Sequence, residues 1–371
     1  MIYVHIPFCK SFCTYCGFYS ETASCYDAFA DALLKEIDER EMEIAGTLEV
    51  PTLYIGGGTP TVLPLSVLER IVSRLHYGPF KEFTIEANPE DLVANGPGYA
   101  ESLLKMGVNR VSMGVQSFDN PVLKWMNRRH DAATAVKAYR MLEDVGFGNI
   151  SIDLIFGFSS SDTGNWSGTI SQALEISASG QPPRHISAYQ LSVEPGSAME
   201  RMIESGKVVM ADEDTCAEEY EILCARLREA GYHHYEISNF AMPGYEAVHN
   251  SAYWSHHPYV GLGPGAHSLS VSPSGQYRRS WNEADLGAYL VSRPRSGERL
   301  DEEQVGLEDL MLALRTSVGI DPRRLLSICR ETRIAEALRL GTLERLSPGG
   351  NLRIPENKFF ISDNIIAELF A

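Results

Sequence analysis

The chain has 371 residues, 44% of them hydrophobic, with 32 basic and 49 acidic side chains and a formal net charge of −17. A chain of this length can bury a full core, which predicts two or three domains or one large α/β barrel with an appendage. The negative charge opposes non-specific binding to nucleic acid or to an anionic membrane, so an anionic ligand would need a local basic pocket.

Cysteine usage and hydropathy indicate the cellular compartment. Four of the seven cysteines, Cys25, Cys216, Cys224 and Cys329, are dispersed and form no disulfide framework, which favours a reducing environment. The sequence does not open on a basic segment followed by an apolar run, and it holds no run of 18 apolar residues. We therefore expect a cytoplasmic protein that meets membranes only through its partners.

The first 200 residues alternate short β-branched runs with longer amphipathic stretches, as the strands and helices of a parallel sheet do. Six such units predict an α/β fold, a partial (β/α)6 barrel whose site lies at the C-terminal ends of the strands. The predicted strands are Ile2–His5, Thr52–Ile55, Glu82–Glu86, Arg110–Val115, Ser151–Phe156 and His185–Leu191.

Three cysteines follow the first predicted strand, at the spacing Cys9-x-x-x-Cys13-x-x-Cys16. This spacing can ligate three irons of a [4Fe–4S] cluster and leave the fourth iron open, whereas electron-transfer clusters normally have four Cys ligands. An open iron can bind and activate a substrate. A structural zinc site and three unrelated thiols are the alternatives, but zinc would require a fourth nearby ligand and only His5 is close.

A glycine-rich turn, Gly56-Gly57-Gly58-Thr59-Pro60-Thr61, follows the second predicted strand. Glycine lets a ligand approach the backbone closely, and the missing Walker lysine argues against a phosphate site. A ligand with amino and carboxylate groups could chelate the open iron while its amino group contacts this turn. Glu86 and Gln116, at the ends of the third and fourth strands, should lie at the same end of the sheet.

The rest of the chain predicts two further parts. Residues 201–300, with a Gly-, Pro-, His- and aromatic-rich stretch, are expected to be an extension that covers the barrel mouth. Residues 301–371 show helical spacing and then a Gly349-Gly350 turn between short strands, which predicts a winged-helix-like domain. Because this part holds 9 basic and 12 acidic side chains, we interpret it as a packing or partner surface that does not bind DNA.

Several motifs in order resemble one protein family over nearly the whole chain. The cysteine loop and the glycine turn resemble the radical S-adenosylmethionine (SAM) superfamily, and more closely its branch of oxygen-independent coproporphyrinogen III oxidases and their relatives. The other motifs of that branch are Tyr3-Val4-His5-Ile6-Pro7-Phe8, Met113-Gly114-Val115-Gln116-Ser117-Phe118, Asn127-Arg128-Arg129-His130, Asp153-Leu154-Ile155-Phe156-Gly157 and Tyr235-Glu236-Ile237-Ser238-Asn239-Phe240.

Within this branch the chain resembles the haem chaperone class, HemW, more than the oxidases. Oxidases carry a fourth cysteine two residues beyond the third, where this chain has Phe18, and an extension before the first strand. The segment His249-Asn250-Ser251-Ala252-Tyr253-Trp254 resembles the haem-binding motif of the chaperone class. Two departures are Gly17, where that class commonly has an acid, and Phe158-Ser159, where Leu-Pro is expected.

The resemblance implies three cofactors and a set of residues for each. Cys9, Cys13 and Cys16 would hold the [4Fe–4S] cluster. His249 would bind haem, although His233, His234, His256 and His257 are rival ligands on chemistry alone, because a neutral imidazole is a common axial ligand of haem iron. The residues expected at SAM are Tyr3, Tyr15, Gly57, Gly58, Thr59, Glu86, Gln116, Arg128, Asp153 and His267.

Two functions follow from the resemblance. In the first, a cytoplasmic haem chaperone receives haem and delivers it to haem proteins of respiration, with an electron donor for the cluster. In the second, a coproporphyrinogen III oxidase cleaves SAM and uses the radical to decarboxylate propionates to vinyl groups. A redox or structural protein that retains only the cluster is the third and least favoured class. We favour the chaperone and assign no catalytic residue.

Overall fold

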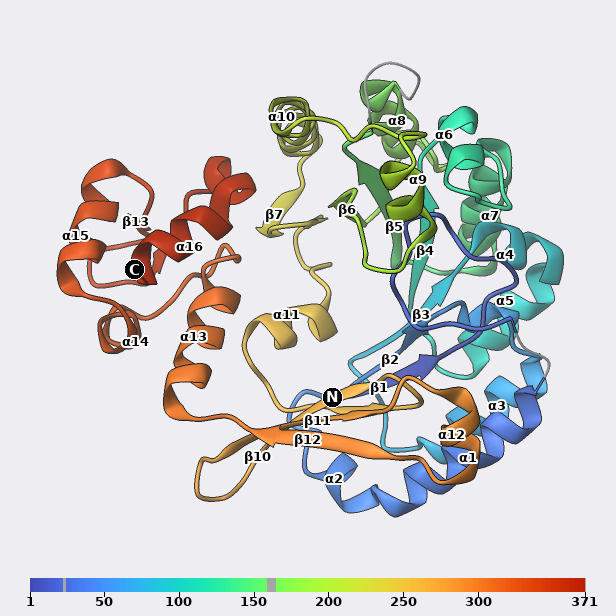
Figure 1. Ribbon diagram of the computed structural model, residues 1–371. Helices are drawn as coiled ribbons and strands as arrows, with labels where there is room; N and C mark the ends of the chain where they lie inside the picture. The colour runs from blue at the N-terminus through green and yellow to red at the C-terminus, as the bar shows by residue number, and fades with distance from the viewer. Residues whose placement is uncertain (23–24, 159–164, 371) are drawn as a thin grey trace.

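The computed structural model describes residues 1–22, 25–158 and 165–370 and is built around a nine-stranded sheet (Figure 1). Six of the strands are parallel and follow one another in chain order, as the sequence predicts, and each predicted boundary lies within about two residues of the observed one. These strands are β1 (Ile2–Ile6), β2 (Thr52–Gly57), β3 (Glu82–Ala87), β4 (Arg110–Gln116), β5 (Ile150–Phe156) and β6 (His185–Gln190). The partial barrel is therefore confirmed.

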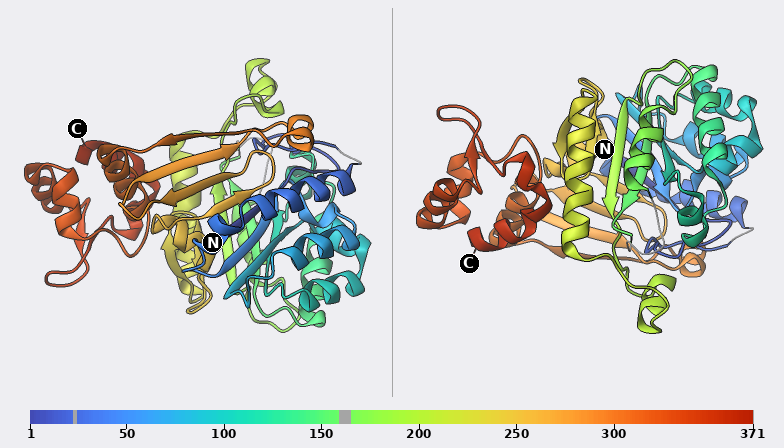
Figure 2. Two further views of the ribbon diagram at one scale, coloured as in Figure 1. Left: turned by 90° about the horizontal axis from the view of Figure 1, so that it is seen from below. Right: turned by 90° about the horizontal axis from the view of Figure 1, so that it is seen from above.

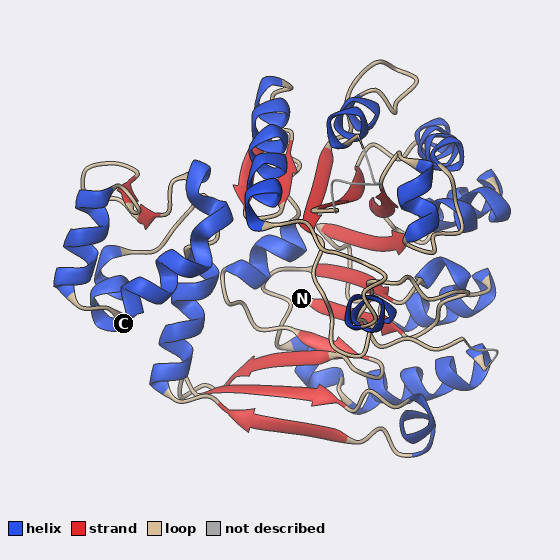
Figure 3. Cartoon of the chain, turned by 45° about the horizontal axis from the view of Figure 1, so that its top comes forward, coloured by secondary structure: helices blue, strands red, loops and turns tan. Residues whose placement is uncertain are grey.

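Helices cover the outer side of these strands (Figure 3). They are α1 (Tyr26–Glu39), α2 (Glu41–Ala45), the short η1 (Pro60–Val62), α3 (Leu65–Arg74), α4 (Pro89–Asn95), α5 (Pro97–Lys105), α6 (Asn120–Trp125), α7 (Ala132–Val145) and α8 (Trp166–Leu174). α7 illustrates why these segments are helical and face the sheet. The Asp131 side chain caps its first turn, and Gly146 ends it in a left-handed conformation. Its buried stripe consists of Ala135, Ala138 and Leu142.

Segments from beyond residue 200 complete both edges of the sheet. β7 (His233–Glu236) and β8 (Asn239–Ala241) add antiparallel strands beyond β6, while β9 (Val260–Leu262) pairs in parallel with β1. Edge strands leave unpaired backbone groups, and these additions pair them. This arrangement was not predicted from the sequence, because the added strands are only three or four residues long.

The remaining elements form a second sheet and a helical group. β10 (His267–Val271), β11 (Tyr277–Asn282) and β12 (Arg295–Arg299) make an antiparallel sheet. The C-terminal helices lie to one side of the large sheet (Figure 2), and their part of the chain also holds a small antiparallel hairpin. The other elements are α9 (Ala198–Glu204), α10 (Glu213–Glu229), α11 (Val248–Trp254), α12 (Leu286–Val291), α13 (Glu302–Ala313), α14 (Pro322–Ile328), α15 (Glu331–Leu340), β13 (Glu344–Arg345), β14 (Leu352–Arg353), η2 (Glu356–Ile361) and α16 (Ser362–Phe370).

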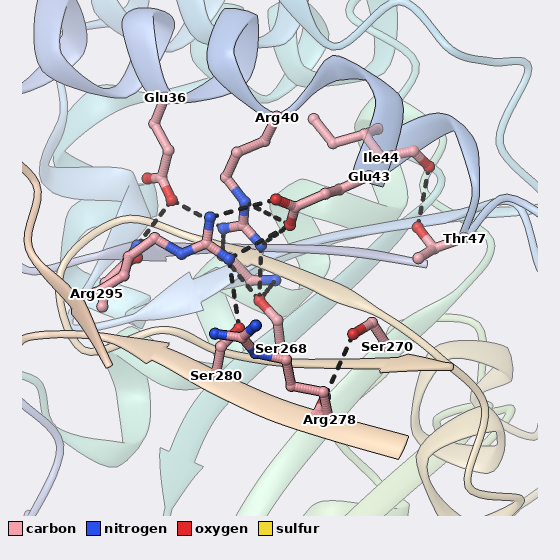
Figure 4. A network of polar contacts seen from close by, with 12 residues as sticks. Glu36, Arg40, Glu43, Ile44, Thr47, Ser268, Ser270, Arg278, Ser280 and Arg295 are labelled. Carbon is pink, nitrogen blue, oxygen red and sulfur yellow. Dashed lines mark hydrogen bonds and ion pairs between the residues drawn. The ribbon is translucent and has the colours of Figure 1, made fainter. Parts of the chain in front are cut away.

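A buried ion pair fastens α1 to the second sheet (Figure 4). Arg40, 3% exposed, donates to Glu36 at 2.9 Å and to Ser268 on β10 at 2.9 Å. Glu36, 2% exposed, also accepts from the Gly263 amide at 2.9 Å and from Tyr289 at 2.7 Å. One carboxylate therefore joins the first helix to the turn after β9 and to α12.

Membrane-spanning helices were sought over the described ranges, and none of the helices there has the length and apolarity to cross a bilayer.

Candidate functional site

The central strands are buried except at a few positions that lie on one face of the sheet. Tyr3 on β1, Tyr54 on β2, Glu86 on β3, Gly114 on β4 and Asp153 on β5 are all partly exposed between buried neighbours. The register pairs Tyr3 with Tyr54 and Gly114 with Asp153, and strand periodicity puts all five on the same face. They line the inner face of the barrel, where a ligand would be held.

The cysteine loop after β1 lies at the C-terminal end of the strands. Its backbone is anchored at several points: the Thr14 amide donates to the Met126 carbonyl at 3.1 Å, and the Met199 amide donates to the Thr14 carbonyl at 2.8 Å. Cys9, Cys13 and Cys16 are all partly exposed. Burial raises the pKa of Cys9 and raises that of Cys16 to about 11, so metal binding there would release protons.

Arg128 connects the cysteine loop to two strand ends. Its guanidinium group contacts the Cys13 sulfur at 3.3 Å, the Asn88 side-chain oxygen at 2.5 Å and the Gly114 carbonyl at 2.7 Å. Its Nε is buried and has no hydrogen-bond partner among the described residues. An unused buried donor beside a cysteine thiol fits an anionic ligand, such as a carboxylate at the open iron.

The glycine turn packs directly against the start of the cysteine loop. The Gly58 amide donates to the Ile6 carbonyl at 2.8 Å and the Thr59 amide donates to the Phe8 carbonyl at 2.7 Å. A Cβ on Gly58 would lie 2.6 Å from the Phe8 oxygen, and Gly57 has a φ of +105°. Both positions therefore require glycine. The Thr59 hydroxyl lies 3.5 Å from the Cys9 sulfur, so this turn borders the cluster loop.

Gln116 ends β4 with a φ of +67°, which is unusual for a residue other than glycine. Its side chain turns back over Gly114, where a Cβ would lie 2.8 Å from the Gln116 amide nitrogen. This conformation keeps the Gln116 amide on the face that Glu86 and Asp153 share, next to Arg128.

Two carboxyl groups stand inside the barrel. Glu86 accepts from the Tyr54 hydroxyl at 2.8 Å and from the Gly57 amide at 3.1 Å, and Asp153 accepts from the Ser112 hydroxyl at 3.1 Å. Burial raises the pKa of Glu86 to about 7 and also raises the pKa of Asp153. Both could accept hydrogen bonds from ribose hydroxyl or ammonium groups, as expected for a SAM site.

The raised pKa of Glu86 predicts a pH-dependent stability. Between pH 4.5 and about 7, Glu86 is protonated in the folded protein but ionised in the unfolded chain. The stability that comes from this difference in pKa is therefore complete below pH 4.5 and is lost as pH rises to about 7. We expect the free energy of unfolding to fall by up to about 3 kcal/mol more in the wild type than in Glu86→Gln between pH 5 and pH 8. Urea unfolding at both pH values measures the difference, and equal changes in the two proteins would contradict it.

The other residues expected at SAM lie at the edges of this region. The Tyr3 hydroxyl shares a 2.9 Å hydrogen bond with His5 Nδ1, and His5 Nε2 lies 2.8 Å from the Tyr19 carbonyl. Both ring nitrogens of His5 therefore have partners. Tyr15 packs against an apolar cluster that includes Met126. His267 is exposed at the start of β10 and stacks on Trp281 at 5.8 Å; among the residues described, its side chain makes no hydrogen bond to the cysteine loop.

The three thiols do not form a site for a single metal ion. Within residues 1–22, 25–158 and 165–370, no three His, Cys, Asp or Glu side chains gather as one ion requires. A four-iron cluster takes each cysteine at a different corner, so its ligands lie farther apart than those of zinc. The donor set of three thiols and one open position fits the cluster.

Asn88, in the Glu86-Ala87-Asn88-Pro89 segment at the end of the third strand, lies near the site although it was not among the residues expected at SAM. It donates to the Thr59 hydroxyl at 3.0 Å and accepts from Arg128, so it joins the glycine turn to the arginine. Its position directly after β3 was the available signal, since polar residues at strand ends line the sites of such barrels.

Comparisons with known proteins bear on the family and the fold of this chain. The Radical SAM superfamily profile matches residues 3–163. The heme chaperone HemW of Bacillus subtilis is 33% identical over 87% of this chain and 85% of its own length, and the heme chaperone HemW of Escherichia coli is 34% identical over 80% and 77%. This chain belongs to the HemW family of radical SAM proteins. Among solved structures, the coproporphyrinogen III oxidase HemN of Escherichia coli shares its fold, with a TM-score of 0.76 and 21% identity over all of this chain and 89% of that one.

The departures from the HemW pattern can be located. Gly17 leaves room for the Glu194 side chain, whose Cγ lies 2.8 Å from where a Gly17 Cβ would be. A carboxylate from the segment after β6 therefore lies beside the position where this class commonly has an acid. Phe158 packs edge-on against Trp125 at 5.6 Å, and Ser159 lies outside the described residues. Phe18, in place of a fourth cysteine, is 69% exposed.

The HemW-type motif lies at the other end of the barrel from the cysteines. The amides of Val248 and His249 donate to Glu82, at the start of β3, at 2.7 Å and 3.1 Å, and His249 Nδ1 shares a 2.8 Å hydrogen bond with Thr52, at the start of β2. The extension was expected to cover the barrel mouth, whereas the motif lies at the opposite end. Another part of the extension, α12, does lie near the cysteine loop, because the Leu286 amide donates to the Tyr19 hydroxyl.

In this structure His249 is buried and both of its ring nitrogens have side-chain partners. It is 1% exposed, and its Nε2 is 3.0 Å from the Tyr253 hydroxyl, so both ring nitrogens have partners. Burial lowers the pKa of His249 to about 3, which keeps the ring neutral. Iron could reach neither nitrogen unless the surrounding residues moved.

Proposed function

We propose that this protein is a haem chaperone, which binds a [4Fe–4S] cluster, SAM and haem and passes haem to other proteins. The observation that carries the proposal is the family: curated HemW proteins share about a third of their residues with this chain over most of both lengths. The site geometry is compatible with the cofactors, because three cysteines, an unpaired arginine donor and the glycine turn meet at one end of the barrel.

The cluster and SAM would be held by the inner face and the strand ends. Cys9, Cys13 and Cys16 would ligate three irons, and Arg128 and Gln116 would bind the SAM carboxylate. The carboxyl groups of Glu86 and Asp153 would accept hydrogen bonds from its ammonium and ribose groups. When reduced, a bound cluster of this kind supplies an electron that can cleave SAM. The chain's part is to position SAM and to exclude water from the barrel.

Coproporphyrinogen oxidation is the second candidate, favoured by the fold likeness to HemN. Two observations argue against it. This chain has Phe18 where oxidases have a fourth cysteine, and the 21% identity to HemN establishes only a shared fold.

One experiment on anaerobically reconstituted protein separates the two. We expect haemin titration to give a Soret band that saturates near one haem per chain, and the loaded protein to transfer haem to apomyoglobin. We also expect no protoporphyrinogen from coproporphyrinogen III, SAM and dithionite, with HemN as the positive control. Formation of protoporphyrinogen at the HemN rate, or the absence of haem binding, would overturn the chaperone assignment.

A further inference from the structure

The outer strand of the small antiparallel sheet, β12, has a free edge. Among the strands of the described residues it pairs only with β11, and the sheet lies at the margin of the molecule (Figure 1 and Figure 3). Four of its five residues are exposed, namely Arg295, Gly297, Glu298 and Arg299. An edge strand of this kind presents unpaired backbone groups, and a strand from another chain can pair with them.

The hydrogen-bond register shows which backbone groups of β12 face outward. The Leu300 amide donates to the Tyr277 carbonyl at 3.1 Å, and the Glu283 amide donates to the Pro294 carbonyl at 3.0 Å. In an antiparallel pair, alternate residues direct both of their backbone groups to the same side, so the even-numbered residues of this strand bond to β11. The odd-numbered residues therefore direct their amides and carbonyls away from the sheet; these are Arg295, Gly297 and Arg299.

The same edge carries a basic surface. Arg278 on β11 lies directly opposite Arg299, in a pair of the non-hydrogen-bonded type, in which the side chains come closest. Both arginines are exposed, and neither forms an ion pair with another residue in the described part of the chain. Arg295, on the same face, pairs with Glu43 at 3.3 Å. Like charges directly opposite each other destabilise a sheet, and an acidic ligand beside them would offset the repulsion.

The middle of this surface is flat and lacks a competing acid. A Cβ on Gly297 would lie 2.8 Å from the Arg279 carbonyl oxygen, so the position has no room for a side chain. Glu298 belongs to the opposite face, where it pairs with Arg279 at 3.7 Å. A second copy of this chain would bring arginines against arginines, which disfavours self-association through this edge. The complementary occupant is an acidic strand.

We infer that the edge of β12 binds an extended acidic segment of a partner protein, which adds a fourth strand to this sheet. The outward-facing amides and carbonyls supply the hydrogen bonds of the ladder, and Arg295 and Arg299 bind carboxylates at alternate positions of the partner strand. Arg278 adds to the local positive potential. Because the chain as a whole carries a charge of −17, this basic strip steers an acidic partner to one edge. The inference goes beyond the proposed function and does not depend on haem binding.

Fluorescence anisotropy of a labelled peptide of alternating Glu and Thr, titrated with the full-length protein, tests the inference. We expect saturable binding of one peptide per chain, which weakens as the salt concentration rises. The double variant Arg278→Gln/Arg299→Gln should weaken binding about tenfold. Arg339→Gln is the matched control, because Arg339 lies on α15 with a side chain that is 70% exposed, and it should bind the peptide as the wild type does.

Pairing of the backbones has a signature of its own. Bound peptide should slow amide hydrogen exchange in β12 at the three outward-facing residues. A peptide of alternating Glu and Pro has the same charge but lacks half of the amide donors, so we expect it to bind about tenfold more weakly. The double variant loses the repulsion between Arg278 and Arg299, and its urea midpoint should therefore be no lower than that of the wild type, which shows that it remains folded.

Three results would overturn the inference. Equal binding of the Glu–Thr and Glu–Pro peptides, or unchanged exchange in β12, would show that charge alone attracts the peptide. Absence of saturable binding of the Glu–Thr peptide would show that the edge takes no acidic strand. Binding of phosphatidylglycerol vesicles through Arg278 and Arg299, without peptide binding, would make this a lipid surface. None of these results bears on haem binding, so the proposed function is tested separately.

Discussion

Replacement of Cys13 by Ser should remove the iron–sulfur cluster. We expect the reconstituted wild type to hold about four irons per chain and to show a broad absorption near 400 nm. The iron content of Cys9→Ser, Cys13→Ser and Cys16→Ser should fall to background, because a cluster with only three protein thiolates needs all of them. Iron analysis and visible spectra measure this effect. Electron paramagnetic resonance of the reduced wild type should change when SAM is added, because the fourth iron is open.

Cys25→Ser is the matched control for these variants. Cys25 comes from the same N-terminal region, directly before α1, and is partly buried against the core. It should keep full iron. If the three loop variants retain iron as Cys25→Ser does, the cluster assignment is wrong, and stoichiometric zinc in the wild type would favour a structural metal site instead.

The second large effect should come from Glu36→Leu, which leaves Arg40 buried without its inner carboxylate. Glu36 accepts four hydrogen bonds, from Arg40, the Gly263 amide, Asn282 and Tyr289. Removal of one partner of a buried ion pair costs roughly 3–5 kcal/mol. In Glu36→Leu, Arg40 would keep only Glu43, at 2.9 Å, whose side chain is 49% exposed. We expect a loss of this size in the free energy of unfolding, measured by urea denaturation, and faster amide hydrogen exchange in β9, β10 and α12.

Two controls show whether burial is the cause. Arg70 pairs with Asp27 and Asp31 at the surface, and Arg70→Ala should cost less than about 1 kcal/mol. The double variant Glu36→Leu/Arg40→Met removes both charges and should recover part of the loss. A cost for Glu36→Leu no larger than that for Arg70→Ala would contradict a structural role for the pair.

Local patterns in the sequence predicted much of the site. The six strands are visible because a buried parallel strand is a short β-branched run, and the residues directly after it must lie at the same end of the sheet. This reasoning located the cysteine loop, the glycine turn, Glu86 and Gln116. The contacts among Arg128, Asn88 and Thr59 were not predictable, since these residues come from different loops.

For the haem motif, the structure adds the surroundings of His249 to what the sequence predicts. The motif singles out His249, yet a sequence pattern does not show whether a side chain is exposed. The fold buries His249 between Thr52 and Tyr253.

The sequence by itself determined the six parallel strands, the three-cysteine loop, the glycine turn and the family, because each is encoded in motifs of a few consecutive residues. Only the tertiary structure decided which partners those residues meet. It showed that short strands beyond residue 200 pair with both edges of the sheet, that Glu194 occupies the space beside Gly17, and that His249 lies at the opposite end of the barrel from the cysteines. The physical reason is that these contacts join distant segments, and their formation depends on the packing of the whole chain.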